Sequence, residues 1–361
     1  MMPLKKIDWY IIRKFLGTFL LIIVLFTVVA IVFDITEKLD DFLDNDAPLS
    51  EIVLIYYPNF IPYLLVLYTP LFLFIATILF TSRLAAKSEI IAITNTGMSF
   101  RRFFRPYFVT AAIVCSLNLY ANHWLLPNAN KKRIAFENKY INLHYENNTD
   151  NIHMQVDKNT YMYVQNFRVS DTTGFKFSID KFKDGKLIWK LRSEKVIWNE
   201  PTKQWKVVNY VIRNNYTNRE SLHEGKDTLM TINFSPQDFG RKTEETSALN
   251  ARELNDVIKN ETLKGSDSVV YYLIEKYKRT AMPFAMFILI VIGVSLSARK
   301  LRGGTGLHLA IGIALCFVYI FFQQFSATFS TNSSLPAWLG VWIPNFLFAA
   351  IAWYLYRKAP K

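Results

Sequence analysis

Long apolar stretches without a charged residue limit the fold of this chain more than any other feature. Residues 15–33 and 52–80 contain no Asp, Glu, Lys or Arg. Each is long enough to cross a hydrocarbon core of ~30 Å as a helix that rises ~1.5 Å per residue. With 361 residues and 51% hydrophobic content the chain could be a large soluble protein, but its apolar residues gather in such runs. We therefore expect both stretches to span a membrane.

Four further apolar stretches complete the pattern. They are residues 106–126, 281–298, 306–329 and 338–356. Six spans predict a membrane α-helical bundle whose two termini lie on the same side. The first span leads directly into the acidic sequence DITEKLDDFLDND without a small-residue cleavage site, so we expect a retained anchor and not a signal peptide.

Basic residues orient the bundle, because Lys and Arg resist translocation across a membrane. They cluster before span one, between spans two and three, between spans four and five, and after span six: Lys5, Lys6, Arg13 and Lys14; Arg83, Lys87, Arg101, Arg102 and Arg105; Arg299, Lys300 and Arg302; Arg357, Lys358 and Lys361. We expect these groups, and both termini, to face the cytoplasm. The net charge of +13 then reflects topology, and no basic–aromatic motif indicates nucleic-acid binding.

The segment between spans three and four has the pattern of a β domain. Alternating runs such as YMYVQNF, GFKFSIDKF, KLIWKLR and QWKVVNYVIR are separated by turn residues. We expect an inserted, extracytoplasmic all-β domain over residues 127–246, folded as a sandwich or jelly roll. Residues 247–277 then form a helical connector, which divides the spans into residues 1–126 and 278–361.

The sequence offers little that indicates catalysis. It contains no nucleotide-binding phosphate loop, nucleophile elbow or paired-histidine metal site. Its two cysteines lie within apolar spans, its five histidines are scattered, and the glycine-rich stretch LRGGTG at 301–306 lacks the lysine that would hold a nucleotide. We expect no catalytic residue, no metal site and no cofactor in this chain.

A polar stretch between spans two and three is the most informative short segment. On a helix over about 83–97, Leu84 and Ile91 form an apolar face, with Ile90 and Ile93 less regularly placed, and Gly97 ends the helix. Such a helix has three possible roles. The alternatives are that it lies on the lipid surface, that it packs under the bundle, or that it docks into a groove of a cytoplasmic partner.

Several motifs resemble one known family. SEIIAITNTGMS at 88–99 resembles the Ser-Glu to Gly-x-Ser signature of the LptF/LptG permease family, which exports lipopolysaccharide. FSPQDFG at 234–240, LNARELNDVIKN at 249–260, the entry to span four at Arg279 and Pro283, the six spans and the β domain are also similar to that family. The resemblance covers essentially the whole chain.

The resemblance implies a permease subunit of an ATP-driven transporter in the bacterial inner membrane. Such a subunit extracts lipopolysaccharide and passes it through a periplasmic jelly-roll domain to a bridge of single-span and soluble jelly-roll proteins. Its implied partners are a second LptF/LptG-type permease and a cytoplasmic ABC ATPase dimer that hydrolyses the ATP. The helix between spans two and three would be the coupling helix, through Leu84, Ser88, Glu89, Ile91 and Gly97.

The expected lipid contacts depart from the family pattern. Family members carry basic residues near the outer end of span one, but here Val32, Phe33 and Asp34 are followed only by Lys38. Lys38, Lys278 and Arg279 are the candidates for the phosphates of the lipid, with solvated or snorkelling side chains as the alternative. The alternative function is a non-transporting envelope assembly protein or a sensor, although the short tail after span six argues against a sensor.

Overall fold

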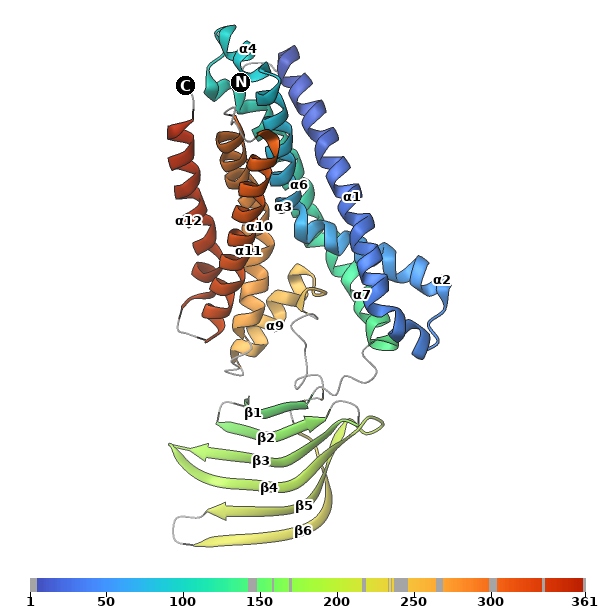
Figure 1. The fold of residues 1–361 in the computed structure, drawn as a ribbon. Coiled ribbons are helices and arrows are strands. Elements are labelled where there is room, and N and C mark those ends of the chain that lie inside the picture. The colour runs from blue at the N-terminus through green and yellow to red at the C-terminus, as the bar shows by residue number, and fades with distance from the viewer. Residues whose placement is uncertain are drawn as a thin grey trace. The chain divides into compact units, whose positions relative to one another are not determined.

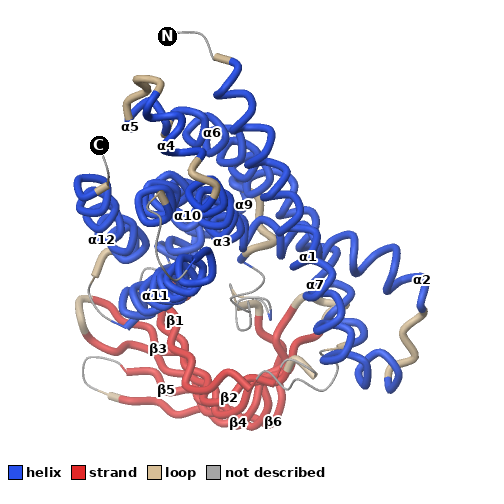
Figure 2. The backbone as a smooth tube through the Cα atoms, turned by 45° about the horizontal axis from the view of Figure 1, so that its top comes forward, coloured by secondary structure: helices blue, strands red, loops and turns tan. Residues whose placement is uncertain are grey.

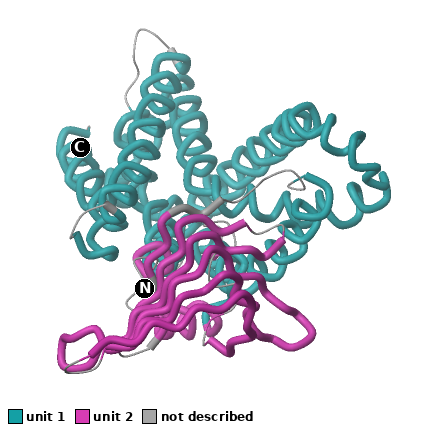
Figure 3. The backbone as a smooth tube through the Cα atoms, turned by 90° about the horizontal axis from the view of Figure 1, so that it is seen from below, with its two compact units in different colours: residues 1–141, 247–251, 273–361 teal, residues 142–246, 252–272 magenta. Residues whose placement is uncertain are grey.

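The computed structural model forms two compact units. It describes residues 5–141, 148–157, 159–168, 171–215, 219–232, 234, 236, 246–263, 269–298, 304–332 and 335–359. Unit 1 contains Met1–Ile141, Ser247–Ala251 and Leu273–Lys361, and unit 2 contains Asn142–Thr246 and Arg252–Tyr272 (Figure 3). Residues 235 and 237–240 of the FSPQDFG motif, residues 301–303 of LRGGTG, and the basic residues Arg299, Lys300 and Lys361 lie outside the described residues.

The described residues contain six helices that are long and apolar enough to cross a membrane, as the sequence predicts (Figure 1). The elements that form them are α1 (Lys6–Asp44); α2 (Leu49–Glu51), the π-helical turn η1 (Ile52–Tyr56) and α3 (Tyr57–Ala86); α5 (Phe100–Phe103), α6 (Arg105–Tyr120), the π-helical turn η2 (Ala121–Leu125) and α7 (Leu126–Tyr140); α10 (Val269–Ser297); α11 (Gly304–Asn332); and α12 (Ala337–Lys358). The short α4 (Glu89–Asn95) connects α3 to α5.

The third long helix continues well past the apolar stretch that predicts it. The apolar stretch predicts a span that ends near residue 126, but α7 extends the helix to Tyr140, and the first strand begins only at Asn148. The buried residues of α7 recur at helical spacing: Leu126, Pro127, Ala129, Asn130, Arg133, Ile134, Phe136, Glu137 and Tyr140. This amphipathic pattern favours a helix, although Lys131, Lys132 and Glu137 make the segment look like part of a polar loop.

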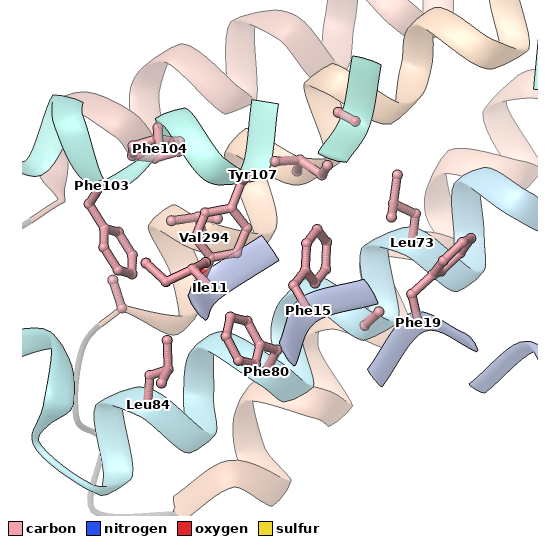
Figure 4. Close-up of a cluster of buried hydrophobic side chains, with 14 of the residues drawn as sticks. Ile11, Phe15, Phe19, Leu73, Phe80, Leu84, Phe103, Phe104, Tyr107 and Val294 are labelled. Atoms are coloured by element: carbon pink, nitrogen blue, oxygen red, sulfur yellow. The ribbon is translucent and has the colours of Figure 1, made fainter. Parts of the chain in front are cut away.

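The main core of unit 1 joins α1, α3 and α6 near one end of the bundle. The Phe15 ring lies 5.9 Å from the Phe80 ring and 5.2 Å from the Tyr107 ring (Figure 4). The Tyr107 hydroxyl is 2.9 Å from Thr81 Oγ1, so its polar atom has a partner inside the core. Buried aromatic rings from three helices therefore fix how these helices pack.

Helices α11 and α12 form a hairpin in which several buried polar groups are paired inside the apolar bundle. Asn345 Nδ2 donates to the Ala281 carbonyl of α10 at 3.0 Å, and the Tyr319 hydroxyl donates to Asn345 Oδ1 at 2.8 Å. Ser326 Oγ donates to the Gly340 carbonyl at 2.6 Å. Pairing of this kind is what a membrane core demands of buried polar groups.

Unit 2 is built on one antiparallel sheet, which is confirmed as the inserted all-β domain (Figure 2). Its strands are β1 (Asn148–Asp157), β2 (Thr160–Arg168), β3 (Thr173–Lys183), β4 (Lys186–Asn199), β5 (Gln204–Asn215) and β6 (Glu220–Met230). The described strands pair in sequence order, without a crossover, and the sheet is not closed, so β1 and β6 are the outermost of the described strands. The helix α9 (Ala251–Leu263) follows.

One face of the sheet carries the core of unit 2. Trp205 is fully buried against Phe167 and Phe234, and its Nε1 donates to the Phe234 carbonyl at 2.9 Å. Met162, Val164, Ile179, Leu191 and Val207 complete this face. The alternation in the strands thus separates a buried apolar face from a polar one, as the sequence indicates.

Candidate functional site

The α4–α5 segment, residues 89–103, forms a cap at one end of the bundle, beside the start of α1 (Figure 1). Helix α3 ends at Ala86, and Ser88 adopts a left-handed conformation with φ of 58° before α4 begins. Gly97 follows α4 with φ of 81°, a conformation that favours glycine. The single helix expected over 83–97 is therefore two helices, because the left-handed residue changes the chain direction between them.

The two faces of α4 have opposite surroundings. Ile90 and Ile93 are buried in the main core, together with Leu84 from the end of α3. Ile91 is 54% exposed. The turn at Ser88 separates Leu84 from Ile91, which the sequence pattern had placed on one face. Two isoleucines therefore anchor α4, while the third is presented at the surface.

Glu89 lies beside the first turns of α1. The Tyr10 hydroxyl donates to Glu89 Oε2 at 3.2 Å, and Lys14 Nζ donates to the Tyr10 hydroxyl at 2.7 Å. A second link joins α5 to α1, because Arg102 Nη2 is 2.5 Å from Asp8 Oδ2. The sequence pattern did not single out Asp8 or Tyr10. The sequence feature that could have indicated this link is the acidic residue Asp8 within the otherwise basic N-terminal sequence KKIDWYIIRK.

Lys38 lies in a balanced cluster of charged groups. Its Nζ is 2.9 Å from Asp34 Oδ1 and 3.6 Å from Glu137 Oε1, and it donates to the Tyr56 hydroxyl. Arg133 Nη1 is 2.8 Å from the same Glu137 oxygen. The cluster thus contains two cations and two anions, and the charge of Lys38 is already neutralised by groups of the protein.

The adjacent residues Lys278 and Arg279 lie in different surroundings. Arg279 is 4% exposed and donates to Glu275 Oε1 at 3.0 Å and to the Leu249 carbonyl at 2.8 Å. Lys278 lines a cavity of about 210 Å³ between α3, α10 and α11. The structure therefore does not gather Lys38, Lys278 and Arg279 into one site.

The cavity is mainly apolar, with few polar groups. Its lining includes Leu67, Leu71, Met282 and Ile320, while Gln323 and Gln324 accompany Lys278. Gln323 Oε1 is buried and has no hydrogen-bond partner among the described residues. Apolar walls with a few polar groups suit an amphiphilic ligand.

Metal-binding chemistry finds no support in the described residues. They contain no cluster of three His, Cys, Asp or Glu side chains that could hold a metal ion. Cys115 and Cys316 are free and buried.

Comparison with known proteins gives one informative result. The model of the family described as "Lipopolysaccharide export system permease LptF/LptG" matches residues 9–358. No curated protein matches the chain. The family match extends over nearly the whole sequence, including the six spans and the β domain. The chain therefore belongs to the LptF/LptG family of lipopolysaccharide export permeases.

Proposed function

We propose that α4 is the helix through which this permease docks onto a cytoplasmic ABC ATPase dimer. The observation that carries the proposal is the exposure of Ile91 on a helix whose other isoleucines, Ile90 and Ile93, are anchored in the bundle. An anchored helix with a protruding apolar side chain fits a partner's groove. The permease, paired with a second LptF/LptG-type permease, then uses ATP hydrolysed by that partner to extract lipopolysaccharide.

Docking on a protein fits α4 better than lying on lipid does. A helix that binds a membrane surface has a broad apolar face and a polar face rich in Lys and Arg. In α4 the exposed positions include Ala92 and Asn95 beside Ile91, and the charged side chain is the acid Glu89. Anionic headgroups repel that acid, whereas a basic residue of a protein partner pairs with it. Ile91 supplies most of the docking free energy, because exposed ion pairs contribute only ~0–1 kcal/mol.

The docking proposal is tested by reversing the charge and the polarity of the exposed face of α4. Glu89→Lys and Ile91→Glu should each reduce co-purification of the ATPase and lipopolysaccharide-stimulated ATP hydrolysis, with normal membrane insertion. Glu37→Lys is the matched control, because Glu37 is an exposed acid on the far part of α1. If both α4 variants retain the ATPase as fully as Glu37→Lys does, α4 is not the docking helix. An assembly protein that moves no lipid would show no lipid-stimulated hydrolysis even in the wild type.

For the lipid, we propose that the cavity beside Lys278 takes part of an acyl chain and that Lys278 pairs with a phosphate. The apolar lining favours the chain, at ~25 cal/mol per Å² of apolar surface removed from water. Lys38 and Arg279 already have carboxylate partners, so we give them supporting roles near the lipid path. Lys278→Gln should weaken capture of a photoactivatable lipopolysaccharide. Lys276→Gln, which changes an exposed lysine of the same helix, should leave capture unchanged.

For the orientation, we propose that both termini and α4 face the cytoplasm and that the β domain lies in the periplasm. Basic residues near the termini and around α4 support this orientation through the positive-inside rule. Reporter fusions after Lys14 and Arg101 should report the cytoplasm, and fusions near Asp44 and Asp184 the periplasm. A periplasmic signal at Arg101 would reverse the orientation.

A further inference from the structure

We propose that Asp8 and Arg102 are positioning residues that fasten the α4–α5 segment to the first turn of α1. Through this link, a movement of α4 is passed to α1 and not only to α3 and α6, the helices continuous with the segment. The inference rests on the proposed docking of α4, and it adds a defined route by which docking reaches the spans.

The link has a fixed geometry at both ends. Arg102 Nη2 lies 2.5 Å from Asp8 Oδ2, and Asp8 is only 1% exposed. The same Asp8 oxygen accepts the backbone N–H of Lys5 at 2.8 Å, so the carboxylate is held at the N-terminal end of α1. Arg102 is held in α5, where its backbone N–H donates to Ser99 Oγ at 3.3 Å. A charge-assisted contact between two fixed side chains is strongly directional.

Stability alone is a poor explanation for this ion pair. Burying the Asp8 carboxylate and most of the Arg102 side chain, which is 20% exposed, removes both charges largely from water, and a well-packed apolar pair is often as stable or more stable. Within the described part of the chain, Asp8 Oδ1 and Arg102 Nη1 are also buried without a hydrogen-bond partner. Such atoms carry a desolvation penalty. The pair therefore serves mainly to fix the position of α5 on α1, and it contributes less to the free energy of unfolding than an apolar pair would.

Buried apolar side chains of α5 and of the start of α1 belong to the same core beside the ion pair. Phe103 of α5 and Ile11 of α1 are both buried in the main core, close to Phe104 and Tyr107 (Figure 4). The contact between Tyr10 and Glu89 joins α4 itself to α1, but it is exposed and correspondingly weak. The part-buried link through Asp8 and Arg102 is thus the stronger of the two connections.

Helix α1 is suited to carry a displacement over a long distance. It runs without interruption from Lys6 to Asp44 and contains no proline, whereas α3 contains Pro62 and Pro70. At ~1.5 Å per residue, its 39 residues extend over about 58 Å. Its far part contains Asp34 and Lys38, which are joined to α7 through Glu137. A shift at Asp8 therefore reaches the charged cluster at the other end of the helix.

The experiment compares two adjacent arginines in the complete transporter reconstituted in liposomes with lipopolysaccharide. Asp8→Asn and Arg102→Gln should retain the ATPase but lower lipopolysaccharide-stimulated ATP hydrolysis about threefold or more, while basal hydrolysis stays unchanged. Arg101→Gln is the matched control, because Arg101 is an exposed arginine of the same helix. It should behave like the wild type. Arg102→Lys keeps the cation and should restore most of the stimulation, which a purely structural role of the guanidinium would not predict.

A second variant covers the case in which a single change leaves a buried charge that prevents folding. Asp8→Asn combined with Arg102→Gln removes both charges, so the double variant should insert and assemble but remain poorly stimulated. The proposal is overturned if the double variant is stimulated as strongly as Arg101→Gln. It is equally overturned if Asp8→Asn and Arg102→Gln lose the ATPase, since the pair would then serve assembly. Failure of the docking proposal is recognised separately, because the Ile91→Glu variant would then bind the ATPase as well as the wild type does.

Discussion

Lys38 and Asp34 form an ion pair one turn apart on α1, with 2.9 Å between Nζ and Oδ1. Glu137 of α7 lies 3.6 Å from the same Nζ and also accepts from Arg133. The cluster joins the far part of α1 to α7 through four charged groups whose charges cancel. Lys38 therefore has a structural role that its isolated position in the sequence does not reveal.

Replacing Lys38 should lower stability before it affects lipid binding. Lys38→Met leaves Asp34 without its cation, which should destabilise the protein by about 3 kcal/mol. The measurement is the thermal unfolding midpoint of the purified protein in detergent. Lys132→Met, which removes an exposed lysine of α7, is the control and should unfold like the wild type. An unchanged midpoint together with a loss of bound lipopolysaccharide would instead make Lys38 a lipid ligand.

Two neighbouring isoleucines of α4 should separate stability from docking. Ile90→Ala removes a buried side chain and should destabilise the protein by about 2–4 kcal/mol. Ile91→Ala removes an exposed one, so the unfolding midpoint should change little while the affinity for the ATPase falls. Unfolding and ATPase binding are measured on the same two samples. Equal effects of both variants on stability would contradict the burial of Ile90 and the exposure of Ile91.

Gly340 should be intolerant of a side chain, in contrast to Gly17. A Cβ at Gly340 would lie 1.7 Å from Ser330 Oγ and 3.0 Å from the Ser326 carbonyl oxygen, so the α11–α12 hairpin would have to open. Gly340→Ala should destabilise by about 1–3 kcal/mol. Gly17 has nothing within 4 Å of that position, so Gly17→Ala should stabilise α1 by up to about 1 kcal/mol. If the Gly340→Ala variant is as stable as Gly17→Ala, the α11–α12 hairpin packs more loosely at Gly340 than these distances indicate.

The fold was largely predictable, because its strongest signals are local. Uncharged runs predict the six spans, and alternating runs predict the strands that surround Trp205. Helix α7 was not predicted, since Arg133 and Glu137 look like solvated charges until their mutual pairing and burial are seen. Charged side chains are rarely buried unless they are paired. One sequence alone does not show which charged residues pair.

The candidate site was predictable in place but not in detail. The signature at 88–99 locates the helix, yet a continuous helix would place Leu84 and Ile91 on one face. The left-handed conformation of Ser88 separates them, and left-handed residues other than glycine have only a weak sequence signal. The ion pair of Asp8 and Arg102 depends on tertiary packing, because these residues are far apart in the sequence.

The edge strand β6 should join the periplasmic bridge. Among the described strands it pairs only with β5, and a strand at the edge of a sheet offers its backbone groups to a further strand. Photo-crosslinkers at the exposed Leu222 and Leu229 should capture a jelly-roll protein of the bridge in intact cells. Ile188, an exposed residue of the interior strand β4, is the control and should capture none. Capture at Ile188 but not on β6 would place the contact on the face of the sheet.

Site-specific photo-crosslinking at Ile91 tests the central claim, that α4 docks onto the ATPase, most directly. The crosslinker is placed at Ile91 in intact cells and, as a control, at Leu21, an exposed apolar residue of span one. Docking predicts a single protein adduct at Ile91 that contains the ABC ATPase, with no such adduct at Leu21. The claim is contradicted if Ile91 captures only lipid, or if the ATPase is captured equally at both positions.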